Sequence, residues 1–206
     1  MSPSDFAGPA APLTDQDLAA AASALGVSIA RIRAVDQVES NGRGFHPETR
    51  RPVILFEPHV FSRLTSGRFD ASHPDLSYPK WGERPYPAAQ SQRYDQLAAA
   101  MALDEGAALQ SASWGRFQIM GYNFKPAGFA SVRDMVRALV RSEGAHLAAF
   151  ASLVSHSAGM LAALRAGDWA GFARAYNGPG YAQHGYDQKL KAAYARLTAP
   201  AASQSA

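Results

Sequence analysis

The chain has 206 residues, 47% of them hydrophobic, with 20 Lys and Arg against 17 Asp and Glu and a formal net charge of +3. This length can bury one substantial core, so a single compact domain is expected, and the small, scattered charge excess does not indicate a nucleic-acid footprint. The sequence has no cysteine, which excludes disulfides, thiolate metal sites and a cysteine nucleophile.

The two ends of the chain predict no leader and no membrane anchor. The first residues have neither a basic start nor an apolar run, and no stretch approaches the ~20 apolar residues of a membrane span. We therefore expect a protein made in the cytoplasm, without membrane insertion, that needs another route if it acts outside. Residues 1–12, rich in Pro and Ala, predict a flexible arm, and residues 199–206 predict a frayed tail.

The first helix signals follow this arm. Thr14 with Asp17 three residues later predicts a capping box, and Gly26 predicts the end of that helix. Ser28 predicts the N-cap of a second helix, which runs to Glu39. The second helix is therefore expected to end in a carboxyl group.

Glu39 is the first candidate for chemistry. It lies next to Val38 and four residues after Val35, at the margin of the predicted buried face and before a glycine-rich segment. A carboxyl group in such a place can be desolvated enough to hold its proton near neutral pH, as a general acid requires. The alternative is a solvated helix-end carboxylate, or one paired with Arg43 or Arg50.

The middle of the chain changes in character. Residues 41–87 are rich in Gly, Pro, His and Arg, and their one β-like run, 52–57, predicts a small hairpin or loop layer. Helical patterns then return over residues 90–104, 132–141, 145–156, 160–166, 169–176 and 186–197. The predicted fold is mainly α, of the α+β kind: a helical bundle with a small β-hairpin lobe near its N-terminal third.

The segment 111–123 is the second candidate region. It places a hydroxyl, an indole, a guanidinium, an amide and a phenol around two glycines, a mixture that suits a sugar ligand because backbone can approach closely. The competing interpretation is that Trp114 and Phe117 anchor the core and that Gln118 is hydrogen-bonded internally.

The segment 175–180 is the third candidate region, with Tyr176 and Asn177 at a Gly-Pro bend. Taken alone it is typical of an ordinary helix end.

The order of these motifs is more specific than any one of them. Glu39 with the glycines after it, Ser-Trp-Gly-Arg-Phe-Gln-Ile-Met-Gly at 113–121 and Ala-Tyr-Asn-Gly-Pro-Gly at 175–180 resemble the lysozyme-like superfamily of goose-type lysozymes and lytic transglycosylases. Within it, Arg-Pro-Val-Ile-Leu-Phe-Glu-Pro-His at 51–59 is similar to the N-acetylmuramidase family of phage endolysins. The resemblance covers about residues 13–197, and we expect residues 13–198 to be the catalytic domain.

The resemblance implies a lysozyme-like fold whose cleft holds peptidoglycan glycan strands. It implies cleavage of the β-1,4 bond between N-acetylmuramic acid and N-acetylglucosamine, with Glu39 as the general acid. Four further residues would line the cleft: Ser113, Gln118, Tyr176 and Asn177. Tyr176 would hydrogen-bond near Glu39, and Asn177 would hold the sugar or the carboxyl group.

A second carboxyl group is normally needed for hydrolysis. Glu57, at the end of the β-like run, is the candidate, because a partner is expected in the hairpin that follows the catalytic helix of lysozyme-like proteins. The alternative is a structural ion pair of Glu57 with Arg51 or Arg116. Weaker candidates in the same lobe are Glu48, Asp70 and Glu83, with Thr65 as a residue that could position a water.

Two other functions stay open at this point. A lytic transglycosylase needs only one acid/base carboxyl, because the muramic acid 6-hydroxyl closes on the anomeric carbon, and a non-catalytic peptidoglycan-binding module would keep the cleft without turnover. The six histidines show no zinc-type spacing, so neither a metal nor another cofactor is expected. The expected partner is peptidoglycan, and no nucleic acid is expected to bind. We expect a monomer that reaches the cell wall after release by a holin or a secretion system.

Overall fold

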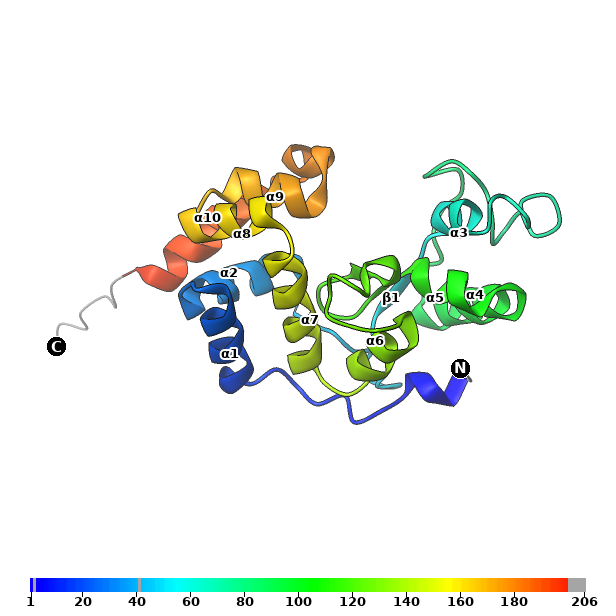
Figure 1. Cartoon of the computed structure of the whole chain (residues 1–206), viewed down its shortest axis with the longest axis horizontal. Coiled ribbons are helices and arrows are strands. Elements are labelled where there is room, and N and C mark those ends of the chain that lie inside the picture. Colours follow the sequence, from blue (N-terminus) through cyan, green and yellow to red (C-terminus); the bar gives the residue numbers. More distant parts are fainter. Residues whose placement is uncertain (2, 41, 200–206) are drawn as a thin grey trace. The chain divides into compact units, whose positions relative to one another are not determined.

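The computed structural model describes residues 1, 3–40 and 42–199, and the chain divides into two compact units (Figure 1). Unit 1 comprises Met1–Leu13 and Arg43–Leu153, and unit 2 comprises Thr14–Gly42 and Val154–Ala206. The catalytic domain expected over residues 13–198 includes residues of both units. Within unit 2, the helix Ile29–Glu39 packs against the last helix of the chain, Tyr186–Thr198.

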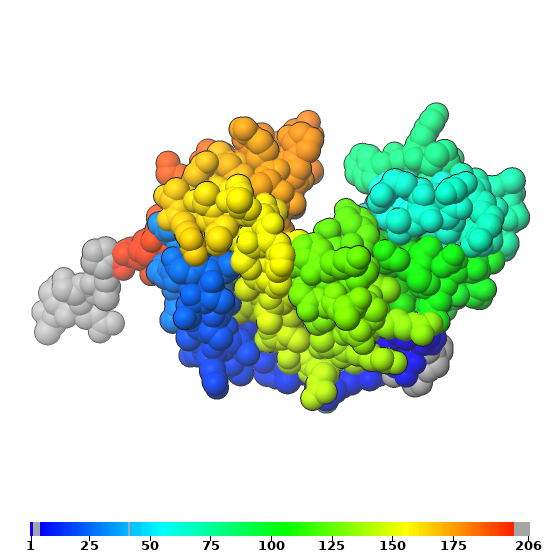
Figure 2. Space-filling view, in the orientation of Figure 1, coloured from blue at the N-terminus to red at the C-terminus, as the bar shows by residue number. Residues whose placement is uncertain are grey.

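Unit 1 combines short helices with a three-stranded antiparallel sheet of strand order β1-β2-β3. Leu55 of β1 pairs with Ser113 of β2, which pairs in turn with Met120 of β3. In Figure 2 the cyan residues of α3 border the green residues of α4 and α5, and α3 contacts α5. The elements of unit 1 are η1 Pro3–Phe6, β1 Ile54–Phe56, α3 Pro58–Leu64, α4 Gln90–Leu103, α5 Glu105–Gln110, β2 Ala112–Trp114, β3 Ile119–Met120, η2 Gly121–Asn123, α6 Val132–Leu139 and most of α7, Glu143–Ser155.

The hairpin of this sheet is not where the sequence predicts it. Among the described residues of the lobe expected over 41–87, which are 42–87, only β1 is a strand, and the β2–β3 hairpin comes from the segment 111–123. Its turn contains Gly115 at φ +69° and Gln118 at φ +47°, so a non-glycine residue in the left-handed region closes the hairpin. The expectation of a mainly helical α+β fold with a small β element is confirmed.

Unit 2 is helical. Its elements are α1 Asp15–Leu25, α2 Ile29–Glu39, α8 Ala158–Ala166, α9 Trp169–Asn177, η3 Pro179–His184 and α10 Tyr186–Thr198. α2 packs against α10, and α8 against α9. In the described part of the chain no single helix is long and apolar enough to span a membrane, although the bent pairs α1–α2 (110°) and α7–α8 (104°) reach that length and hydropathy together.

The caps predicted for α1 and α2 are confirmed. The Thr14 N–H donates to Asp17 Oδ2 at 2.9 Å and the Asp17 N–H donates to Thr14 Oγ1 at 3.2 Å, which forms the capping box. Gly26 ends α1 in the left-handed region at φ +64°. The Ser28 hydroxyl accepts the Arg31 N–H at 3.3 Å, so the start of α2 is fixed and Glu39 falls on its last turn.

The N-terminal segment packs against unit 1. The sequence predicts a flexible arm over residues 1–12, but Phe6 is only 3% exposed, and its ring lies 5.8 Å from that of Trp114 and 5.5 Å from that of Tyr94. Ala11 forms a β-bridge with Ser142. One buried aromatic ring can hold such a segment, because its apolar area leaves water. The tail predicted over residues 199–206 lies outside the described residues from Pro200 onward.

A buried polar network holds the start of α7 in unit 1. Glu143 Oε1 accepts the Gly44 N–H at 2.7 Å and pairs with Arg116 Nη1 at 3.0 Å, and its other oxygen accepts the Leu13 N–H at 3.1 Å. The His146 ring accepts the Arg116 N–H at Nδ1 (3.0 Å) and lies 2.6 Å from the Leu139 carbonyl at Nε2, while burial lowers the pKa of His146 to about 4. The neutral imidazole therefore joins three segments without adding a buried charge.

Replacing Glu143 with Ala is expected to destabilise the protein by about 3–5 kcal/mol, because the buried Arg116 guanidinium loses its partner and two backbone N–H groups lose their acceptor. Denaturant unfolding of the purified variant measures this. The matched control is Glu48→Ala at an exposed position, which should leave the free energy of unfolding nearly unchanged. Equal stability of the two variants would contradict the structural role given to this network.

Candidate active site

Glu39 is the last residue of α2 in unit 2, and its side chain is half-buried. The Asn177 amide, on the last residue of α9, donates from Nδ2 to Glu39 Oε1 at 3.0 Å. The helix ends at Ser40, whose hydroxyl accepts the Gly42 N–H at 3.0 Å. Glu39 is thus held by a neutral partner, while Arg50, one alternative partner considered from the sequence, donates to the Pro9 carbonyl.

The surroundings of Glu39 favour its protonated form. Burial raises the pKa of Glu39 above its usual 4.5, and the Asn177 hydrogen bond and the Lys189 charge lower it by less. Burial also raises the pKa of Tyr176 and of Tyr186, and the negative charge of Glu39 raises both further. Both phenols therefore stay protonated beside this carboxyl group, so the site has the character that a general acid needs.

The sequence-predicted residues in unit 2 do come together. Tyr176 and Asn177 lie at the end of α9, within interaction range of Glu39. Tyr186 and Lys189 of α10 are additional members that the sequence did not indicate. Their proximity to Glu39 depends on the packing of α10 against α2, which no local pattern encodes.

Glu57 lies in unit 1, in the N-cap position between β1 and α3. The Tyr86 hydroxyl donates to Glu57 Oε2, and His59 Nδ1 lies 3.3 Å from the same oxygen. Burial raises the pKa of Glu57, and the Tyr86 hydrogen bond lowers it by less. Burial and the Arg63 charge lower the pKa of His59, so the imidazole is neutral at neutral pH and the pair is not an ion pair.

The ion-pair alternative for Glu57 is not the arrangement that the structure shows. Arg116 pairs with Glu143 at 3.0 Å, and the Arg51 guanidinium lies over the Tyr94 ring, 5.0 Å from its centroid. Glu57 instead has uncharged neighbours, a surrounding in which a carboxylate can hold a water or stabilise a developing cation.

Two tyrosines near Glu57 were missed from the sequence. Burial and the Glu57 carboxylate raise the pKa of both Tyr78 and Tyr86. Each of them precedes a proline in the irregular segment between α3 and α4. These two Tyr-Pro pairs are the signal that could have drawn attention to them.

Ser113 and Gln118 hold the hairpin of unit 1. The Ser113 hydroxyl donates to Gln118 Oε1 at 2.8 Å, and Gln118 Nε2 donates to the carbonyls of Gly115 (2.7 Å) and Val53 (3.2 Å). The internal hydrogen bonding considered for Gln118 is therefore present. The Glu57 N–H donates to the Ser111 carbonyl at 2.9 Å, so the β2 segment also fixes the backbone from which Glu57 projects.

The remaining candidates in this lobe have other partners or are exposed. Asp70 accepts the Ser62 hydroxyl at 2.9 Å and the Ser77 hydroxyl at 2.5 Å, and Thr65 Oγ1 donates to the Phe61 carbonyl at 2.8 Å. Glu48 and Glu83 are exposed. Within the described ranges no group of three His, Asp or Glu residues is placed to hold a metal ion.

Comparison with known proteins relates the chain to a family and to solved structures. Residues 28–198 match the N-acetylmuramidase family. The crystal structure of a Burkholderia AP3 phage endolysin resembles this chain with a TM-score of 0.83 and 43% sequence identity, over 90% of this chain and 70% of that chain. No curated protein matches the sequence. The family match includes both Glu39 and Glu57.

Proposed function

Because the chain belongs to the N-acetylmuramidase family, we propose that it cleaves the β-1,4 bond between N-acetylmuramic acid and N-acetylglucosamine. As a muramidase it is a glycoside hydrolase, and its substrate is the peptidoglycan of the cell wall. The observation that supports a role for Glu39 is its half-buried carboxyl, whose raised pKa keeps the proton available. Release to the wall by a holin or a secretion system, and action as a monomer, stay predictions.

Glu39 has the role of general acid in this proposal. It gives its proton to the glycosidic oxygen as the bond to the anomeric carbon of muramic acid breaks, and the Asn177 amide steadies the carboxylate that remains. Tyr176 adds a protonated phenol near the same group. Asn177 and Tyr176 are proposed to contact the sugar on this side.

Glu57 has the role of the second carboxyl group. Either it removes a proton from the water that adds to the anomeric carbon, or it stabilises the positive charge on that carbon directly. The Tyr86 hydroxyl, which donates to Glu57 Oε2, fixes the orientation of the carboxylate. The surroundings of Glu57 support this role, because the contacts of its carboxyl group described above are with Tyr86 and His59 and not with an arginine.

Product analysis tests the reaction class. Mass spectrometry of digested peptidoglycan should show new reducing ends on N-acetylmuramic acid. New ends on N-acetylglucosamine would contradict the proposed bond, and 1,6-anhydro-muramic ends would assign the chain to the transglycosylases. Binding without release of soluble fragments would leave only a peptidoglycan-binding module.

Lys189→Gln is expected to move the alkaline limb of the pH–activity profile to higher pH. A general acid must be protonated, so activity falls as the pH rises through the pKa of Glu39. The Lys189 charge lowers that pKa, and its removal therefore raises it. Hydrolysis rates measured across the pH range check this, with Lys191→Gln on the exposed face of α10 as the matched control. An unmoved limb, or one moved to lower pH, would argue against Glu39 as the acid.

A further inference from the structure

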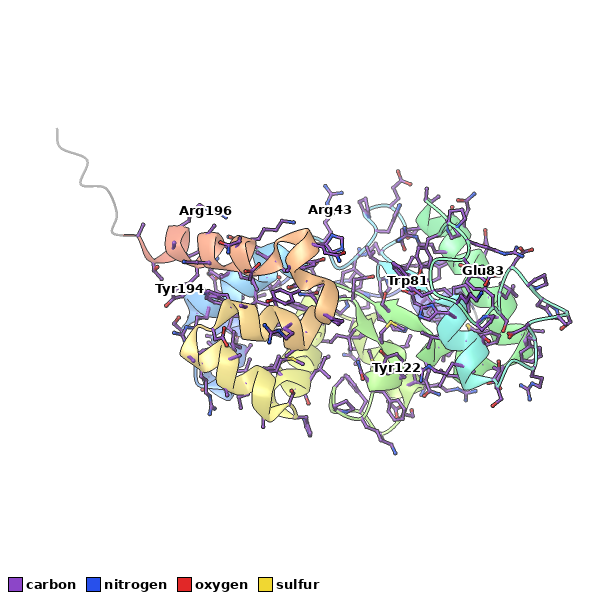
Figure 3. All side chains as sticks on the ribbon, turned by 90° about the horizontal axis from the view of Figure 1, so that it is seen from above. Arg43, Trp81, Glu83, Tyr122, Tyr194 and Arg196 are labelled. Carbon is purple, nitrogen blue, oxygen red and sulfur yellow. The ribbon has the colours of Figure 1, made fainter. Side chains whose placement is uncertain are left out.

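Two exposed aromatic side chains of unit 1 have no evident part in its fold. Among the described residues, the large hydrophobic side chains that stay exposed are Ile29, Trp81 (73%) and Tyr122 (40%). Figure 3 shows Trp81 and Glu83 on the long segment between α3 and α4, and Tyr122 beside the sheet region. Single exposed aromatics are common on protein surfaces, so their meaning depends on what they contact.

Trp81 is connected to Glu57. Its indole lies near enough to the Tyr86 hydroxyl to lower the pKa of that phenol, and this hydroxyl donates to Glu57 Oε2. The segment that carries Trp81 has the buried Tyr78 before it, and an exposed ion pair joins Arg84 to Asp75. The indole therefore lies near the carboxyl group, with most of its surface exposed.

Tyr122 is linked to the same carboxyl group through Arg63 and His59. The Arg63 guanidinium lies over the Tyr122 ring, 5.5 Å from its centroid. Arg63 is four residues after His59 on α3, on the same helix face, and His59 Nδ1 lies 3.3 Å from Glu57 Oε2. Glu57 is thus linked to Trp81 through Tyr86, and to Tyr122 through His59 and Arg63.

The chemistry of Trp81, Tyr122 and Arg63 suits a peptidoglycan strand. An exposed indole or phenol offers a flat apolar face to a sugar ring, with a polar edge for its hydroxyls. Alternate sugars of peptidoglycan carry a lactyl group with a stem peptide, whose carboxylates fit a guanidinium. Arg63 is exposed, so its charge is available to a ligand beside Tyr122.

We propose that Trp81 and the Arg63–Tyr122 pair are two sugar-binding subsites that serve Glu57, the first stacking on a pyranose ring and the second taking a sugar that bears an acidic stem peptide. This proposal rests on the proposed function, because it presupposes a glycan substrate. It assigns a substrate contact to the segment between α3 and α4, which carries none of the four residues listed from the sequence to line the cleft, and another to Tyr122 of η2, within the candidate region 111–123.

Binding is measured in the Glu39→Gln protein, so that turnover does not interfere. The probes are soluble glycan fragments of peptidoglycan with and without stem peptides. Trp81→Ala is expected to weaken the affinity for both fragments on the order of tenfold, the loss of one anchoring aromatic. Arg63→Gln should weaken only the binding of the peptide-bearing fragment. Ile29→Ala is the control, an exposed hydrophobic residue in unit 2 that should change neither affinity.

Tryptophan fluorescence gives a readout that a merely structural role would not move. Trp81 is 73% exposed, whereas Trp114 is 1% and Trp169 is 9% exposed, so quenching by a water-soluble quencher reports mainly on Trp81. Glycan should protect this fluorescence from the quencher, and Trp81→Ala, which lacks the exposed reporter, gives the background signal of the two buried tryptophans. In the active enzyme the same variant should raise KM more than it lowers kcat.

The failure of the subsites and the failure of the proposed function are distinguishable. An active muramidase whose tryptophan quenching is unchanged by glycan, and whose affinity for glycan is unchanged by Trp81→Ala, would overturn the subsites alone. A chain that releases no fragments but still protects Trp81 would keep the subsites and lose the function. Equal effects of Arg63→Gln on both fragments would overturn the peptide contact.

Discussion

Replacing Glu39 with Gln is expected to lower the rate of peptidoglycan hydrolysis by about 10²–10⁴-fold, the usual contribution of a positioned general acid. Gln has the same shape and can still accept the Asn177 hydrogen bond, but it has no proton to give to the glycosidic oxygen. Release of soluble fragments from purified peptidoglycan measures the loss. Glu48→Gln at an exposed position is the control and should keep the wild-type rate.

The same variant should be as stable as the wild type at pH 7, or more stable. The folded-state pKa of Glu39 is raised above 4.5, so the folded protein holds this proton more tightly than the unfolded chain does. As the pH rises from the pKa of Glu39 in the unfolded chain through its raised pKa in the folded protein, ionisation of Glu39 lowers the free energy of unfolding. Below the pKa of the unfolded chain, Glu39 has no such effect. Because Gln carries no charge, it does not lower the free energy of unfolding in this way. Loss of activity together with loss of stability would point to a structural role, and retained activity would remove Glu39 from the mechanism.

Replacing Glu57 with Gln is the change with the second largest expected effect, a loss of about 10²-fold or more in hydrolysis rate. The amide oxygen can still accept the Tyr86 hydroxyl, so the local structure should be kept while the negative charge is lost. Fragment release and thermal unfolding, measured on the same preparation, separate chemistry from folding.

Glu83→Gln is the matched control for Glu57, since it removes an exposed carboxylate from the segment that follows α3. It should leave the hydrolysis rate unchanged. If Glu57→Gln behaves like this control, Glu57 is a structural partner of Tyr86 and the reaction proceeds with one carboxyl group. Anhydro products from such a variant would then identify the substrate's own hydroxyl as the second group.

Local patterns predict the parts of the fold whose hydrogen bonds are local. The Thr14–Asp17 capping box, the Ser28 cap and the left-handed end at Gly26 each depend on residues within one turn of one another, so the sequence is sufficient to find them. The position of Glu39 at the end of α2 follows from the same signals.

Contacts between distant residues could not be predicted in this way. The antiparallel pairing of Leu55 with Ser113 joins strands that are far apart in the chain, and the turn of the hairpin requires a positive φ at Gln118, which is not a glycine. Burial of Phe6 against Trp114 likewise depends on tertiary packing, which is why the Pro- and Ala-rich start gave the appearance of a flexible arm.

The candidate site shows the same division. The order of the motifs led to Glu39, Tyr176 and Asn177, which the structure brings together in unit 2. The partners of Glu57, by contrast, came only from the structure, because Tyr86 belongs to an irregular segment without a periodic pattern.

The most direct test of the central claim is digestion of peptidoglycan in heavy-oxygen water by the wild type and by Glu39→Gln, followed by mass spectrometry of the fragments. The wild type should place one heavy oxygen on each new reducing end of N-acetylmuramic acid, because hydrolysis adds water to the anomeric carbon, and the variant should produce almost no such ends. Labelled ends formed at equal rates by both proteins would contradict the role of Glu39, and unlabelled anhydro ends from the wild type would contradict hydrolysis itself.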